Sequence, residues 1–236
     1  MPKIKKRNGA AKEPEQEILT VAHKVSGLMA AYRNQVTIAV AAVAIALVVL
    51  AGYSFIRSSQ EQKAAPLVAV AHEYYSPAGA MNADYAKALE LFRDVQKKYP
   101  GTKSGAIAQY YVGNCLINMG RPDEALKEYQ AFVNRYPDEK FLLGLVYQRM
   151  GYASLMLGKQ AEAVKAFELS EKVAGPGVAT VELARLYEAS GNIPESQKKY
   201  KLIMEKLTGT SWGIEAMGKV QMIAPAAQPA AGKTGK

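Results

Sequence analysis

The chain has 236 residues, and 49% of them are apolar, which is enough for a packed core and excludes a fully disordered polymer. Its formal net charge is +9, but the charge is unevenly distributed. Residues 1–35 carry seven basic and three acidic side chains, whereas residues 57–223 carry 21 basic and 18 acidic ones. The long C-terminal part is therefore nearly balanced, which argues against binding to a nucleic-acid backbone.

The sequence offers little for catalysis or for metal binding. Cys115 is the only cysteine and is surrounded by apolar residues, so we expect a buried side chain and no intrachain disulfide. The two histidines, His23 and His72, are predicted to lie on opposite sides of a membrane. No Ser-His-acid set, glycine-rich phosphate loop or metal-ligand cluster is present. We therefore predict no enzyme activity, no catalytic residue, no metal, no other cofactor and no small-molecule substrate.

Residues 1–35 are predicted to form a basic cytoplasmic segment. The first 17 residues are highly charged and typical of disorder. Apolar residues then recur at helical spacing from Ile18 to Tyr32, which predicts a short amphipathic helix at the membrane surface. A simple extension of the membrane span that follows is the alternative.

Residues 36–56 contain no charged side chain and are predicted to cross a membrane. A helix of this length extends roughly 31 Å, which matches the hydrocarbon core of a bilayer. Seven basic residues precede the segment, and only Arg57 and Lys63 fall in the next twenty residues. Because basic flanks stay in the cytoplasm, we expect an uncleaved anchor with its N-terminus cytoplasmic and its C-terminal part in the bacterial periplasm.

Four later stretches repeat one pattern, in which an aromatic residue follows a small residue by four positions. The pairs are Ala88 and Phe92, Ala125 and Tyr129, Ala163 and Phe167, and Ser196 and Tyr200. The first two copies end in Tyr-Pro, at Pro100 and Pro137, where a helix normally stops.

A second pattern precedes three of these copies, in which a turn glycine follows a small residue by seven positions. The pairs are Gly113 and Gly120, Gly151 and Gly158, and Ala184 and Gly191. Closely crossing helices need a small residue at the crossing point, and a glycine can supply the left-handed turn that ends the first helix. Together the two patterns resemble the tetratricopeptide repeat, which implies an all-α solenoid of antiparallel helix pairs.

This resemblance predicts a repeat domain at 57–223 and a disordered tail at 224–236. The full repeats are predicted at 106–139, 144–176 and 177–210. A degenerate first unit has helices at about 59–75 and 83–99, and a last single helix begins at Ser211.

The first helices of successive repeats are expected to line a concave groove that binds proteins or peptides. Each position that faces this groove either contacts a partner or packs against a neighbouring helix, and the sequence leaves open which of the two applies. The candidate binding residues are Ile107, Tyr110, Asn114, Asn118, Gln148, Tyr152, Met156 and Arg185.

The layout of a basic segment, one span, repeats and the final stretch SWGIEAMGKVQMI resembles the YfgM-like ancillary subunit of the SecYEG translocon. Membership of that family would imply association with the Sec translocon, with periplasmic chaperones and with newly exported proteins, at the bacterial inner membrane.

Two alternatives remain open. The Tyr-Pro repeats also resemble those of scaffolds for envelope assembly, cell division or wall synthesis, although such proteins carry cleaved signals or lipid-modified cysteines. The other alternative is an accessory regulatory subunit that acts through its cytoplasmic segment.

Overall fold

The computed structural model describes residues 32–76 and 82–223, and within these ranges all regular structure is α-helical. The predicted amphipathic helix at 18–32 and the tail at 224–236 lie outside the described residues, except for Tyr32. The helices are α2 (Arg33–Tyr75), α3 (Tyr85–Lys98), α4 (Lys103–Asn118), α5 (Pro122–Arg135), α6 (Lys140–Met156), α7 (Gln160–Ala174), α8 (Val178–Ala189), α9 (Ile193–Lys206) and α10 (Ser211–Ile223).

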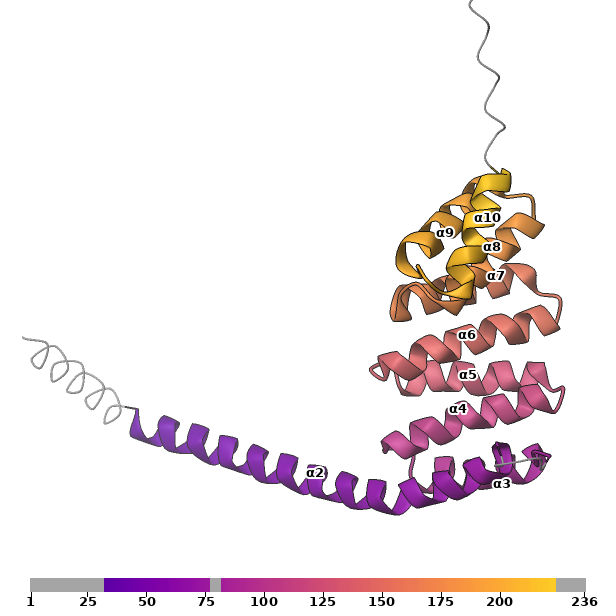
Figure 1. Cartoon of the computed structure of the whole chain (residues 1–236). Helices are drawn as coiled ribbons and strands as arrows, with labels where there is room; N and C mark the ends of the chain where they lie inside the picture. The colour runs from indigo at the N-terminus through magenta and orange to yellow at the C-terminus, as the bar shows by residue number, and fades with distance from the viewer. Residues whose placement is uncertain (1–31, 77–81, 224–236) are drawn as a thin grey trace, which may run out of the picture. The chain divides into compact units, whose positions relative to one another are not determined.

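The chain divides into two compact units, residues 1–56 and 57–236. In the second unit, α3 to α10 follow one another as antiparallel helices (Figure 1). The predicted all-α solenoid is confirmed.

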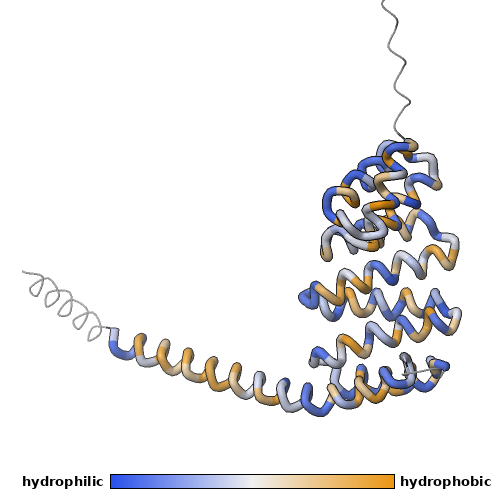
Figure 2. The backbone as a smooth tube through the Cα atoms, in the orientation of Figure 1, coloured by the Kyte–Doolittle hydropathy of each residue, from blue (hydrophilic) through white to orange (hydrophobic). Residues whose placement is uncertain are grey.

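The first unit contains the apolar part of α2, which Figure 2 shows as a hydrophobic run in the N-terminal half of this helix. All side chains from Arg33 to Arg57 are exposed in the part of the chain that the structure describes. Among the described residues, α2 is the one helix that is long and apolar enough to cross a membrane.

The sequence suggested a span at 36–56 followed by a separate helix at about 59–75, but the structure places both in one continuous helix. The intervening stretch RSSQEQKAA contains no glycine or turn signal and several good helix formers. Pro66 lies inside the helix without ending it. The boundary between the two units therefore falls within α2, after Ile56.

The C-terminal part of α2 serves as the first helix of the solenoid. Ala64 and Ala71 are fully buried in the core, and Val68 packs beside them. The Glu61 carboxylate accepts hydrogen bonds from the Ser104 backbone N–H (3.1 Å) and hydroxyl (2.6 Å), at the N-terminus of α4. This acceptor satisfies an amide that the first turn of a helix leaves unpaired.

Each full helix pair is built around an aromatic ring that covers a glycine or alanine. A Cβ added at Gly113 would lie 2.2 Å from the Tyr129 ring, and one at Gly151 would lie 2.6 Å from the Phe167 ring. In the third pair, Ala184 and Tyr200 are buried in the same cluster. The predicted crossing of α4 with α5, α6 with α7, and α8 with α9 is therefore what the structure shows.

The three predicted turn glycines adopt the left-handed conformation, with φ of 72° at Gly120, 70° at Gly158 and 76° at Gly191. After Gly120, the Arg121 N–H bonds back to the Leu116 carbonyl at 2.8 Å, and the same bond recurs after the other two glycines. This arrangement satisfies carbonyls that the end of a helix leaves free.

The second helices of the first two pairs have Tyr99 and Tyr136 as their C-caps, each immediately before a proline, so both helices stop at the predicted place. The Tyr136 hydroxyl donates to the Pro100 carbonyl at 2.7 Å, which ties the two helix ends together. The first helices α4 and α6 begin three and four residues earlier than predicted. For α4 the reason is Thr102, whose hydroxyl accepts from the Gly105 N–H at 2.9 Å and fixes an earlier start.

Cys115 is fully buried, as predicted. Burial raises the pKa of its thiol to about 12, so the side chain is a neutral packing group.

Replacing Gly113 with alanine should destabilise the solenoid, because the added methyl group collides with the fully buried Tyr129 ring. We expect a loss of about 1 to 3 kcal/mol in the free energy of unfolding, measured by urea denaturation with circular dichroism. Gly218→Ala in α10 is the matched control, since nothing lies within 4 Å of its added Cβ. The control should gain up to about 1 kcal/mol from helix propensity. Equal midpoints for the two variants would contradict the ring-on-glycine contact.

Candidate functional site

The eight predicted binding residues lie on the first helices α4, α6 and α8, but they differ in exposure. Tyr110 and Asn114 are buried, with exposed fractions of 8% and 3%. Ile107, Gln148 and Tyr152 are half-buried, whereas Asn118, Met156 and Arg185 are exposed. We call one surface of the solenoid the first-helix face. It consists of the exposed and half-buried residues of α4, α6, α8 and α10 that contact one another across successive repeats.

Asn114 has a packing role. Its Oδ1 accepts a hydrogen bond of 2.7 Å from the Tyr129 hydroxyl, deep in the α4–α5 crossing. Burial raises the pKa of Tyr129 far above its usual value, so this hydroxyl remains a donor. A residue predicted to meet a partner thus holds the helix pair together, and the sequence did not distinguish these two uses of one helix face.

Asn118 lies at the edge of an aromatic cluster formed by α2, α3 and α4. Its side-chain amide donates to the Tyr75 hydroxyl at 3.3 Å. The Tyr75 ring contacts Tyr111 (4.9 Å between centroids) and Tyr85 (5.6 Å), and Tyr111 stacks on Phe92 at 5.0 Å. These contacts hold the end of α2 against the first full repeat.

Arg149, on α6, is a residue of this face that the sequence analysis did not select. It is half-buried and forms a side-chain hydrogen bond with Tyr110. Burial works to lower the pKa of its guanidinium, but the hydrogen bond with Tyr110 and the charges of nearby tyrosines outweigh this, so the pKa is raised. Among the described residues, no ion pair includes Arg149, and it stays charged without a carboxylate partner.

A signal for Arg149 was present in the sequence. The helix that contains it has no aspartate or glutamate, and neither has α4. A basic residue in such a stretch has no local partner at i±3 or i±4, but only the structure shows which side of the helix it occupies.

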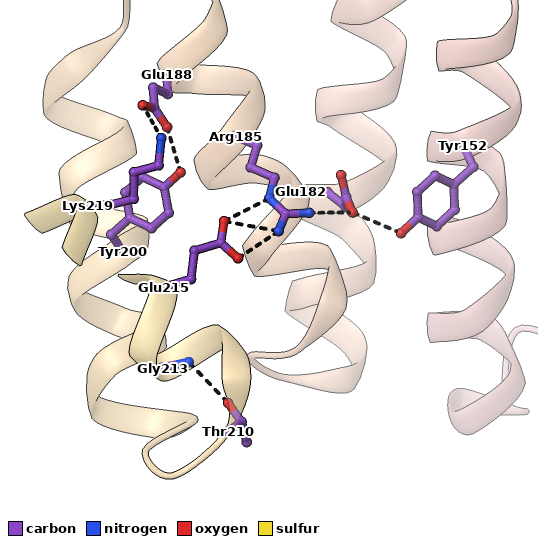
Figure 3. A network of polar contacts seen from close by, with 9 residues as sticks. All are labelled: Tyr152, Glu182, Arg185, Glu188, Tyr200, Thr210, Gly213, Glu215 and Lys219. Atoms are coloured by element: carbon purple, nitrogen blue, oxygen red, sulfur yellow. Dashed lines mark hydrogen bonds and ion pairs between the residues drawn. The ribbon is translucent and has the colours of Figure 1, made fainter. Parts of the chain in front are cut away.

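The C-terminal half of the first-helix face is a chain of polar contacts that links α6, α8 and α10 (Figure 3). The Tyr152 hydroxyl donates to Glu182 at 3.1 Å, and Glu182 lies 3.7 Å from Arg185. Arg185 in turn bonds both carboxylate oxygens of Glu215, at 3.0 and 2.8 Å. The two predicted residues Tyr152 and Arg185 are therefore brought together through Glu182.

A second set of contacts joins α8, α9 and α10 around Glu188 (Figure 3). Lys219 Nζ donates to one carboxylate oxygen and the Tyr200 hydroxyl to the other, each at 2.7 Å. The hydrogen bond from Lys219, followed by that from Tyr200, holds the pKa of Glu188 below its usual value of 4.5. Within this half of the face, the acidic residues are thus neutralised by the protein itself.

A separate hollow of about 410 Å³ lies among α5, α6 and α7. Its α6 residues Tyr147, Met150 and Ser154 fall on the opposite side of that helix from Gln148 and Tyr152, by helical register. Its rim carries Lys127 and Lys165. In the part of the chain that the structure describes, no cluster of three or more potential metal ligands occurs.

Replacing Lys219 with methionine should raise the pKa of Glu188, because the largest cause of its depression is removed. A carboxylate with a depressed folded pKa adds stability above its unfolded pKa, and this stability is lost as pH falls through the folded pKa. The variant should therefore lose less stability on acidification than the wild type. The pKa is measured by NMR titration of the Glu188 carboxyl carbon. Lys201→Met on α9 is the control and should leave the titration unchanged; an unchanged titration in Lys219→Met would show that the ion pair does not form in solution.

Comparison with known proteins supports the same repeat. A tetratricopeptide-repeat family model matches residues 79–102 and 107–139. No curated protein matches the chain significantly.

Solved structures resemble the fold at low sequence identity. The nearly identical TPR-like repeats of a putative kinesin light chain from Podosopora anserina share 16% identity and a TM-score of 0.53, covering 68% of this chain and 85% of that one. A tetratricopeptide repeat protein from Parabacteroides merdae shares 14% identity and a TM-score of 0.55, covering 69% of this chain and 60% of that one. Residues 79–102 and 107–139 thus match tetratricopeptide repeats, and the likeness to the solved structures shows the same all-α solenoid fold, which typically serves as a non-catalytic scaffold for protein–protein interaction.

Proposed function

We propose that this protein is a membrane-anchored scaffold whose repeats bind proteins or peptides in the periplasm, in association with the Sec translocon, periplasmic chaperones or newly exported proteins. The observation that carries the proposal is the continuity of α2. One helix contains an apolar stretch whose side chains are all exposed among the described residues and, further along, the first helix of the solenoid.

The apolar stretch supports an anchor on energetic grounds. Large side chains such as Ile38, Val48 and Phe55 are each at least two-thirds exposed, at 69%, 72% and 76%. Each would gain about 1.5 to 3 kcal/mol on transfer from water to an apolar environment, and a bilayer supplies that environment along the whole segment. The excess of basic residues before the segment supports a cytoplasmic N-terminus.

The first-helix face supports protein binding. Met156 is 52% exposed on the same side of α6 as Gln148 and Tyr152, and no ion pair among the described residues includes Arg149. Mixed aromatic, methionine and arginine surfaces of this kind are common where proteins meet. The choice of Sec-associated partners rests on the resemblance of the overall layout to the YfgM-like family.

The anchor and its direction can be tested by fractionation. The full chain should stay with the membrane after alkaline carbonate extraction, and deletion of residues 36–56 should release it. In intact spheroplasts, added protease should degrade the repeats while an epitope placed before residue 1 survives. A wild-type chain that is extracted by carbonate, or repeats that are protected from the protease, would overturn the proposal.

Partner identity can be tested with a photo-crosslinking amino acid at Met156, with Gln130 on α5 as an exposed control away from the first-helix face. We expect crosslinks to Sec subunits, chaperones or exported chains from position 156 and not from position 130. Crosslinks to wall-synthesis or outer-membrane assembly proteins would favour an envelope scaffold. Crosslinks only from positions introduced within residues 1–35 would favour a regulatory subunit.

A further inference from the structure

The last described helix, α10, has the sequence pattern of a first helix. In the three full pairs, an apolar residue directly precedes the small residue of the first helix, as Val112 precedes Gly113. In α10, Met217 precedes Gly218 in the same way. This helix also packs on α8 and α9 through the buried Ala216, as the first helix of a next repeat would. Within the described residues, no second helix follows it (Figure 1).

The positions that a second helix covers in the full pairs are exposed in α10. In α4, Gln109 and Val112 lie four residues and one residue before the small residue, and both are buried. The equivalent residues of α10, Ile214 and Met217, are 66% and 47% exposed. Nothing lies within 4 Å of a Cβ added at Gly218, whereas the equivalent glycines of α4 and α6 are each covered by a ring. The place of that ring is therefore open in α10.

The outward side of α10 is apolar. Its residues recur at spacings of three and four along the helix and are Ile214, Met217, Gly218, Gln221 and Met222. The cluster that α10 shares with α8 and α9 contacts the opposite side of the helix. A solenoid normally ends in a helix with a polar outer face, which keeps the protein soluble. An outward side with three large apolar side chains and no charge therefore indicates contact with another molecule.

The full pairs show what kind of group covers such a position. In α5 and α7, the ring that lies over the glycine stands four residues after a small residue of its own helix. These residues are Ala125 with Tyr129 and Ala163 with Phe167, and all four are fully buried. The group that fits Gly218 is therefore a helix with the same two residues on its apolar face.

The second helices of this chain have no ring to spare for α10. Their rings that follow a small residue by four positions are all buried in their own pairs, and these are Phe92, Tyr129, Phe167 and Tyr200. Phe55 follows Ala51 by four positions, but it lies in the stretch proposed to cross the membrane. Residues 224–236, which follow α10 in the sequence, contain no aromatic residue. A second copy has the same rings in the same places, which favours a different protein as the source.

We propose that the outward side of α10 binds an amphipathic helix of a partner protein, and that this helix carries phenylalanine or tyrosine four residues after alanine or serine. The ring lies over Gly218, and Ile214 and Met217 pack against apolar residues beside it. The partner helix completes the pair that α10 begins. This surface goes beyond the proposed function, since it is separate from the first-helix face and does not depend on a ligand bound there.

The test selects binders from a displayed library of random helices of about 18 residues, with the full-length chain in lipid nanodiscs as the target. Helices that bind a Gly218→Leu variant equally well are removed. We expect the remaining helices to share an aromatic residue four positions after a small one. Changing that aromatic residue to alanine in a synthetic helix should weaken binding at least about tenfold, because a buried aromatic anchor commonly contributes this much.

Gly218→Leu should weaken binding of the synthetic helix at least about tenfold, because the leucine side chain occupies the space of the ring. The variant should fold normally, since the added Cβ meets nothing within 4 Å, and thermal unfolding checks this. Ala161→Leu is the matched control, because it enlarges an exposed residue on α7 and should bind like the wild type. Met217→Lys, which places a charge on the outward side, should also weaken binding.

Two kinds of result would overturn this inference. One is a selection that yields no helix sensitive to Gly218→Leu, or sensitive helices that lack the shared pattern. The other is self-association of the wild-type chain, measured by sedimentation, that Gly218→Leu removes, because the occupant would then be a second copy. Both leave the proposed function standing, since that function is tested by the membrane anchor and by crosslinks from Met156.

Discussion

The contact on which the solenoid depends is an aromatic ring lying on the bare backbone of the facing helix. Tyr129 covers Gly113 and Phe167 covers Gly151, at distances that leave no space for a methyl group. Such contacts let the two helices of a repeat approach closely and hold them at one crossing angle. The α4–α5 and α6–α7 pairs cross in this way, and in the α8–α9 pair Ala184 and Tyr200 are buried in the same cluster, so successive first helices lie beside one another. The polar contacts from Tyr152 to Glu215 require that arrangement, since they join α6, α8 and α10.

The first-helix face has two halves with different electrostatic character, although it is built from equivalent helices. Towards the C-terminus each acid meets a base, and Glu188 is held ionised by Lys219 and Tyr200. Towards the N-terminus, no acid is present on α4 or α6, and Arg149 forms a hydrogen bond with Tyr110. Exposed ion pairs contribute little stability, so the ion pairs of the C-terminal half chiefly fix the positions of side chains.

The continuity of α2 gives the same helix two different surroundings. Before Ile56 its side chains are exposed on every side, whereas Ala64 and Ala71 are fully buried among the helices of the repeats. Small residues such as Ala64 and Ala71 suit the part of α2 that packs in the solenoid, because α2 lies close to its neighbours there. In the same part, Glu61 caps the N-terminus of α4. The exposed large aliphatic residues before Ile56 are favourable in an apolar solvent, which agrees with the membrane anchor proposed above.

The sequence by itself determined the helix pairs, because the features that define them are local. Glycines at fixed spacing end the first helices, prolines follow the second helices, and a ring stands four residues after each small residue, so each element could be placed before any contact was known. The predicted span at 36–56 and the predicted helix at about 59–75 form one helix in the structure, since the polar stretch between them contains no turn signal. The uses of individual face residues were decided only by the tertiary structure. Asn114 turns inward to the Tyr129 hydroxyl, while Arg149, one residue from the predicted Gln148, forms a hydrogen bond with Tyr110 of α4. Helical register gives the side of a helix on which a residue lies, but the partner that it meets depends on residues that are distant in the chain.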